Sequence, residues 1–191
     1  MSQSHPLQTL AKHLPRRDCR NTSVRDIYSM PLVFTDIDDL ANELRERVGS
    51  SGIIAMDGWT GVGKSTLAKT LASTLGGCWY DLDRALTHDQ KRYVSALRLP
   101  EVSEALAIPL RPLFVSGICL LQVFADLGVS LDAHVYLKRM TAWGWADEEE
   151  LTGAIPEVPG ASGEFVRQEL RIYHREWQPH IVAQYEFQRL G

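Results

Sequence analysis

The chain of 191 residues is 45% hydrophobic and 23% charged, which is typical of one soluble globular domain with a sizeable core. Its formal net charge of −4 argues against nucleic acid as a partner, because proteins that bind it carry a basic surplus. The three cysteines form no zinc-binding pattern and favour a reducing compartment, and no stretch approaches the ~20 apolar residues of a membrane span. We therefore expect a cytoplasmic protein with no membrane partner.

Residues 1–30 are polar, basic and interrupted by prolines, so we predict an N-terminal extension in front of one domain at 31–191. Within it, Leu7, Leu10, Ala11 and Leu14 have the spacing of a short helix. Two interpretations stay open: a loosely held terminus, or a segment that packs on the domain or on a second subunit in a homodimer.

The domain is predicted to begin with a helix from Thr35 to Val48, followed by a buried parallel strand at 53–56. Directly after this strand, Gly58 to Ser65 fits the G-x-x-x-x-G-K-[ST] pattern of a phosphate-binding loop. Apolar residues then recur at helical spacing from Leu67 to Leu75. The order of strand, glycine loop and helix is the one that phosphate binding needs, whereas a glycine-rich turn that binds nothing is the alternative.

This loop predicts a nucleotide site that uses ATP and Mg²⁺ as cofactors. Its glycines allow main-chain N–H groups to wrap a phosphate, Lys64 supplies a charge to the β- and γ-phosphates, and the Ser65 hydroxyl is a ligand for Mg²⁺. The candidate nucleotide-binding residues are Gly58, Trp59, Thr60, Gly61, Val62, Gly63, Lys64, Ser65 and Thr66.

A second strand over 78–83 ends in two carboxylates, Asp81 and Asp83. If this strand neighbours the first, both carboxylates lie beside the phosphate loop, because parallel strands present their carboxyl ends at one edge of the sheet. Asp81 is then the candidate base and, with Ser65 and Asp83, a candidate metal ligand. The alternative is that the aspartates only cap the following turn. The candidate substrate contacts surround Asp81 in sequence: Tyr80, Arg84, His88 and Tyr93.

A helix is predicted over 89–99, ending before Pro100, and a third strand over 112–117. Ser116 occupies the end of that strand, where many nucleoside triphosphatases have an acidic residue. The pattern then predicts a helix over 118–127 and a strand over 133–137, in which His134 is expected to be a core or edge residue rather than a catalytic one.

We interpret residues 138–163 as a mobile lid and 164–178 as a helix that carries Arg167, Arg171 and Arg175 on one face. Arg171 and Arg175 are the candidate catalytic arginines that clamp phosphates, and a solvated cationic face is the alternative. Alternating residues at 185–190 predict an edge strand.

Several stretches resemble the P-loop nucleoside and small-molecule kinases, most closely the uridine kinase family. The resemblance is carried by 58–66, by 81–87, by Val115-Ser116-Gly117-Ile118, and by 173–179 with 183–185. The chain has Ser116 where that family usually has glutamate, and only Lys138-Arg139 where it has an arginine-rich lid. The resemblance implies ATP-dependent phosphorylation of a hydroxyl, with Asp81 as the base.

Together these observations predict an α/β protein with the three-layer P-loop NTPase fold, in which helices flank a parallel sheet under a mobile lid. The predicted activity is transfer of the γ-phosphate of ATP to a hydroxyl of a small molecule such as a nucleoside, a sugar or a cofactor precursor. The alternative, favoured by Ser116 and the short lid, is a nucleotide-binding regulatory protein or an NTPase without efficient transfer.

Overall fold

The computed structural model describes residues 30–87, 92–154 and 162–190. Within them a seven-stranded sheet has the order β1-β7-β5-β2-β4-β3, all parallel, with β6 paired antiparallel to β5. The strands are β1 Leu32–Phe34, β2 Ile53–Gly58, β3 Cys78–Asp81, β4 Leu113–Ser116, β5 Ala133–Thr141, β6 Gly144–Trp145 and β7 Tyr185–Leu190. The predicted parallel sheet is therefore confirmed.

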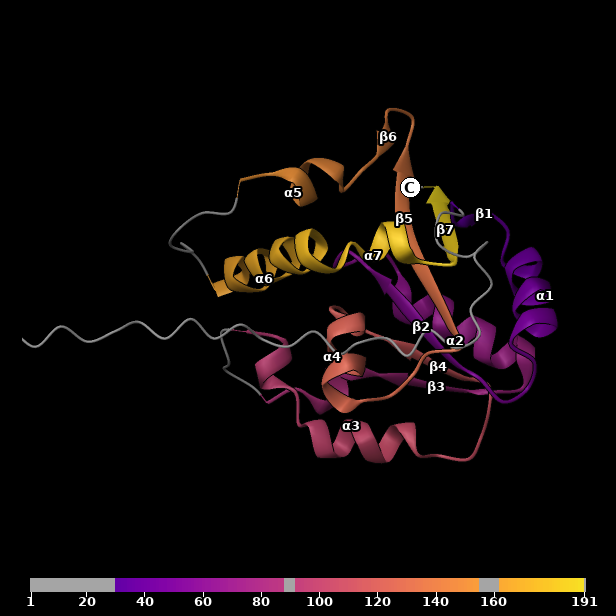
Figure 1. The fold of residues 1–191 in the computed structure, drawn as a ribbon. Coiled ribbons are helices and arrows are strands. Elements are labelled where there is room, and N and C mark those ends of the chain that lie inside the picture. The colour runs from indigo at the N-terminus through magenta and orange to yellow at the C-terminus, as the bar shows by residue number, and fades with distance from the viewer. Residues whose placement is uncertain (1–29, 88–91, 155–161, 191) are drawn as a thin grey trace, which may run out of the picture.

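Helices cover both faces of the sheet, so the predicted three-layer α/β architecture is also confirmed (Figure 1). The helices are α1 Ile37–Arg47, α2 Lys64–Leu75, α3 Leu99–Leu106, α4 Leu120–Leu127, α5 Glu148–Thr152, α6 Ser162–Trp177 and α7 Pro179–Val182. α1 and α2 pack together on one face, and α4 and α6 pack together on the other. The hydrophobic core lies between these helices and the sheet, mainly at the strands β2, β4 and β5. No helix in the described part of the chain is long and apolar enough to cross a membrane.

The central strand β2 positions the glycine loop and the helix that follows it. Ile54, Ala55 and Met56 have no exposed surface, as expected for a strand covered by helices on both faces. β2 lies between β4 and β5 and delivers the glycine loop to the carboxyl edge of the sheet. The helix predicted after the loop is α2, and Gly76 ends it in the left-handed conformation at φ 67°.

The last strand corrects one prediction. β7 is not an edge strand, because it is paired with β5 on one side and with β1 on the other. β1 was not predicted, since three residues are too few to show a periodicity. The first helix also begins later than predicted: Asp36, not Thr35, is its N-cap, and its carboxylate accepts from the N–H groups of Asp38 and Asp39 at 2.8 and 3.2 Å.

The helix predicted over 89–99 is wrong for its described residues. Val94–Ala96 form one 3₁₀ turn, and α3 begins only at Leu99. Pro100 therefore starts a helix rather than ending one, because the first helical turn needs no hydrogen-bonded N–H and the proline ring suits its φ. Residues 88–91, and with them the candidate substrate contact His88, lie outside the described residues.

The predicted lid, 138–163, consists in part of regular elements. β5 continues to Thr141, turns into β6, and is followed by α5, which packs on α6. Residues 155–161 lie outside the described residues, as does the N-terminal extension before Met30. That this segment closes over a site stays a prediction.

Candidate functional site

The phosphate loop runs from the end of β2 at Gly58 to the start of α2 at Lys64. Gly58 and Gly63 adopt φ values of 144° and 100°, which side chains with a Cβ rarely tolerate. A Cβ on Gly58 would lie 2.6 Å from the carbonyl oxygen of Leu137 in β5. Glycine is therefore required here for the loop to stay against the sheet, with its amides at the amino end of α2.

Not every loop residue can meet a ligand with its side chain. Trp59 and Val62 are 4% and 1% exposed and pack in the core. The loop residues that line the cavity next to Asp81 are Thr60, Gly61, Gly63, Lys64, Ser65 and Thr66. Trp59 lines neither cavity beside the loop, and Val62 lines only the one on the β7 side.

Lys64 lies inside the curve of its own loop. Its ammonium donates to the carbonyl oxygens of Gly58 at 3.1 Å and Trp59 at 2.6 Å. Burial lowers the pKa of Lys64, although the negative charges of Asp57, Asp83 and Asp81 oppose that shift. The lysine is therefore already positioned at the loop, and an anion in the loop would favour its charged form.

A relay of hydrogen bonds joins the loop to the ends of β3 and β4. Trp79 Nε1 donates to Ser116 Oγ at 3.0 Å, Ser116 Oγ donates to Ser65 Oγ at 3.3 Å, and Ser65 Oγ donates to Asp81 Oδ2 at 2.7 Å. The expectation that the Asp81 strand neighbours the loop strand is wrong, because β4 lies between β3 and β2. Asp81 reaches the loop nevertheless, since α2, which carries Ser65, packs on both β3 and β4.

The two carboxylates after β3 have different partners. Asp81 Oδ1 accepts from the N–H of Asp83 at 3.2 Å, so Asp81 caps the turn as well as meeting Ser65. Asp83 Oδ1 accepts from the Tyr93 hydroxyl at 2.7 Å. Burial and the charge of Asp83 raise the pKa of Tyr93, so its hydroxyl stays a donor. Tyr93 and Val94 in turn donate their N–H groups to Glu169 of α6.

Two cavities flank the loop. The first, of about 470 Å³, is lined by Lys64, Ser65, Asp81, Asp83 and Tyr93, and also by Leu86, Gly117, Ile118 and Val166. The second, of about 740 Å³, lies between the start of α1, the start of α2 and the end of β7. Gly63 and Thr66 line both cavities. We call them the carboxylate cavity and the β7 cavity.

Comparison with known proteins supports the fold. No family model and no curated protein matches the chain. One similar solved structure is that of a possible uridine kinase from Bacillus stearothermophilus, with a TM-score of 0.51 and 14% sequence identity over 79% of this chain and 96% of that one. The chain has a P-loop kinase-like fold.

Several predicted residues of the P-loop site lie elsewhere. Neither Tyr80 nor Arg84 lines the carboxylate cavity, and the Arg84 guanidinium lies 5.0 Å from the centre of the Trp79 ring. Arg171 is held by Glu150 and Glu164, each at 2.8 Å, and joins α5 to α6. Arg175 is exposed and lines neither cavity. The geometry therefore gives no support to Arg171 and Arg175 as a phosphate clamp.

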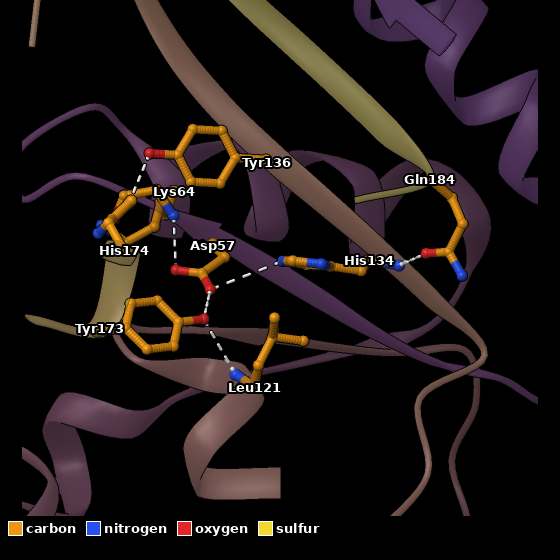
Figure 2. A network of polar contacts seen from close by, with 9 residues as sticks. Asp57, Lys64, Leu121, His134, Tyr136, Tyr173, His174 and Gln184 are labelled. Carbon is orange, nitrogen blue, oxygen red and sulfur yellow. Dashed lines mark hydrogen bonds and ion pairs between the residues drawn. The ribbon is translucent and has the colours of Figure 1, made fainter. Parts of the chain in front are cut away.

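Sequence reasoning missed a buried polar network behind the P-loop (Figure 2). Asp57 is fully buried; it accepts from its neighbour Gly58 N–H at 2.7 Å and from the hydroxyl of Tyr173 in α6. His134 Nε2 lies 3.6 Å from Asp57 Oδ2, and neither ring nitrogen of His134 has a hydrogen-bond partner in the described structure. Burial alone would raise the pKa of Asp57, but His134 and the Tyr173 hydrogen bond outweigh it and lower the pKa. The sequence held one signal of this network: Asp57 is a charged residue at the end of an otherwise apolar strand.

His174, next to Tyr173, completes this network. Its Nδ1 lies 2.8 Å from the Leu170 carbonyl oxygen and its Nε2 lies 2.8 Å from the Tyr136 hydroxyl. Because a carbonyl only accepts, Nδ1 carries the proton and Nε2 accepts from Tyr136. Burial lowers the pKa of His174 to about 4, so the ring is neutral at pH 7.

Proposed function

We propose that the protein is a phosphotransferase that moves the γ-phosphate of a magnesium-bound nucleoside triphosphate, expected to be ATP, to a hydroxyl of a small molecule. The observation that carries this proposal is the pair of cavities that share Gly63 and Thr66 of the loop. A triphosphate on the loop amides would extend its nucleoside into the β7 cavity. Its terminal phosphate would then face the carboxylate cavity, where there is room for a second substrate.

The residues present fit Mg²⁺ that arrives with the nucleotide. In the described part of the chain, no group of three acidic, histidine or cysteine side chains could hold a metal by itself. Mg²⁺ does not need one, because it is commonly held by one or two protein oxygens, phosphates and waters. Ser65 Oγ donates a hydrogen bond to Asp81 Oδ2 at 2.7 Å and accepts one from Ser116, which leaves a lone pair of the hydroxyl for a metal ion. Bound there, the ion would neutralise charge on the β- and γ-phosphates.

The chain's own groups would perform four tasks. Lys64 and the loop amides stabilise charge that develops on the transferred phosphoryl group. Asp81 accepts the proton of the acceptor hydroxyl, and Asp83 is the candidate for contact with magnesium or substrate. Tyr93 holds Asp83 by a hydrogen bond and lines the cavity, so it orients a small acceptor. Leu86, Ile118 and Val166 exclude water from the same space.

The experiment is a screen for ADP release that depends on an acceptor, with nucleosides, sugars and cofactor precursors as the library. Uridine is the first acceptor to try, because the similar structure is named a possible uridine kinase. Transfer should stop in Lys64→Ala and survive in Asp126→Asn, whose exposed carboxylate on α4 lines neither cavity. If no library member raises ADP release from the wild-type protein, the proposal is wrong.

Ser116 supports a second candidate function, a nucleotide-binding protein without efficient transfer. The end of β4 supplies a buried hydroxyl instead of a carboxylate, so Asp81 and Asp83 are the acidic groups that line the carboxylate cavity. This candidate predicts that the wild-type protein binds nucleotide and releases no ADP with any acceptor. A bare triphosphatase would instead release ADP at the same rate with and without acceptors.

A further inference from the structure

Arg189 brings a cation to the P-loop from an unexpected direction. It lies near the end of β7, and its side chain lines the β7 cavity. A Cβ on Gly63 would lie 2.9 Å from Arg189 Nη1, so the guanidinium lies directly over the last glycine of the loop. Lys64 approaches the loop from its inner side, and Arg189 approaches it from the cavity side.

Three other cations near the predicted lid are already paired, and Arg175 is exposed and lines neither cavity. Lys138 pairs with Glu186 at 2.7 Å, Arg139 pairs with Asp147 at 2.7 Å, and Arg171 pairs with Glu150 and Glu164. Arg189, by contrast, forms no ion pair with any residue that the structure describes. Its positive charge lies beside Gly63, at the positive end of the twelve-residue helix α2. Like charges held together in this way are stabilised when an anion lies between them.

We infer that Arg189 is a phosphate-binding residue, which contacts the phosphates of the donor nucleotide where they leave the loop for the β7 cavity. The inference rests on the proposed function only in that the ligand is a nucleotide. A guanidinium can donate two parallel hydrogen bonds to the oxygens of one phosphate, which a lysine cannot do. Arg189 would therefore supply the second cation that phosphoryl transfer needs beside Lys64.

The test is a binding measurement in the absence of acceptor. The titrants are MgATP or MgGTP, whichever the full-length wild-type chain binds more tightly, and inorganic tripolyphosphate with magnesium, which has phosphates and no base. The variants are Arg189→Met, Arg189→Lys and the control Arg45→Met, which removes the same charge from α1 outside both cavities. Thermal unfolding of each variant verifies that it is folded.

Arg189→Met should weaken both the nucleotide and tripolyphosphate by about 10-fold or more, the loss expected for a charge-assisted hydrogen bond. Arg189→Lys should fall in between, and Arg45→Met should bind like the wild type. Unchanged tripolyphosphate affinity in Arg189→Met overturns the inference, because a loss confined to the nucleotide means that Arg189 contacts the base or ribose.

The outcome is separable from that of the proposed function. A wild-type chain that binds nucleotide but phosphorylates no acceptor removes the kinase proposal and leaves the Arg189 measurement valid. A wild-type chain that binds neither nucleotide nor tripolyphosphate overturns both.

Discussion

Asp57 lies at the end of β2, which leads into the P-loop, and Asp81 ends β3 at the same edge of the sheet, yet the two carboxylates have opposite surroundings. Asp57, behind the loop, is fully buried and accepts from Gly58 and Tyr173. Asp81, in front of it, lines the carboxylate cavity and accepts from Ser65 and Asp83. The first can meet no substrate, whereas the second faces the space where a substrate would lie. The position of a carboxylate relative to the loop, rather than its residue type, therefore decides whether it supports the fold or can contact a substrate.

The largest effect is expected for Asp81→Asn, and it should fall on turnover rather than on stability. Asparagine can still accept from Ser65 but cannot take a proton, so acceptor-dependent kcat should fall by about 10²- to 10⁴-fold. Asparagine keeps one of the two hydrogen bonds that Asp81 accepts, and its amide lies beside a cavity rather than in the core, so nucleotide affinity and the thermal midpoint should change far less than turnover. Steady-state kinetics with a responsive acceptor is the measurement, and Asp126→Asn is the control. Retained turnover in Asp81→Asn would remove Asp81 as the base.

The front of the site was more predictable than the back because its signals are local. Strand β2, the loop and α2 follow one another within about 25 residues, and each has a strong pattern of its own. Ser65, Asp81 and Tyr93, which were candidate site residues from the sequence, line the carboxylate cavity, and their roles stay predictions. Tyr80 and Arg84 were named by proximity in sequence alone. Tyr80 precedes Asp81 in β3, where successive side chains point to opposite faces, and Arg84 lies in the turn after β3, so neither lines the cavity.

The network behind the loop joins residues far apart in the chain. Asp57 and Tyr173 are separated by 116 positions, and nothing in the helical spacing of Tyr173 distinguishes an apolar contact from a hydrogen bond. Whether β7 is an edge strand or an inner strand depends likewise on a distant segment, because the three-residue strand β1 pairs with its outer side. Arg189 could not be assigned from the sequence, because a strand pattern does not tell which loop its end approaches.

Asp57→Asn tests the back of the site and should act on stability. The amide nitrogen of asparagine would face the Gly58 N–H, two donors with no acceptor, and the buried charge opposite His134 would be lost. Removing one partner of a buried charged group costs about 3 to 5 kcal/mol. Urea unfolding at pH 7 measures the change, with Asp81→Asn as the matched variant. A loss below about 1 kcal/mol, within the range of ordinary surface substitutions, would show that Asp57 is not a structural carboxylate.

The pH dependence of stability sharpens the same contrast through His174. Its pKa is about 4 in the folded protein and 6.5 as a free side chain, so between these values the unfolded state binds a proton that the folded state does not. Its contribution to stability is complete above pH 6.5 and is lost as the pH falls to about 4. At about 1.4 kcal/mol per pH unit, the loss is about 3 kcal/mol.

His174→Gln removes this titration while keeping a polar side chain. Between pH 7 and pH 4 the wild-type protein should therefore lose about 3 kcal/mol more than the variant, as measured by urea unfolding at both values. His180 stacks on His174 and is present in both proteins, and its positive charge adds to the lowering of the His174 pKa. Parallel pH profiles for the two proteins would mean that His174 is not held neutral by burial.

Tyr173→Phe is expected to have the smallest effect, and it asks whether the back of the site holds α6 to the loop. The hydroxyl donates to Asp57 and accepts from the Leu121 N–H at 3.2 Å, so its removal leaves a buried carboxylate oxygen and an N–H group without that partner. Such a loss costs about 1 to 2 kcal/mol in urea unfolding. Tyr185→Phe is the control, since Tyr185 is also buried and its hydroxyl forms no hydrogen bond within the described residues.

Because α6 also carries Glu169, which anchors Tyr93, a loosened α6 should raise the KM of the acceptor more than that of the nucleotide. Equal changes in both constants, or equal stability of the two variants, would mean that the Tyr173 hydroxyl does not connect α6 to the P-loop.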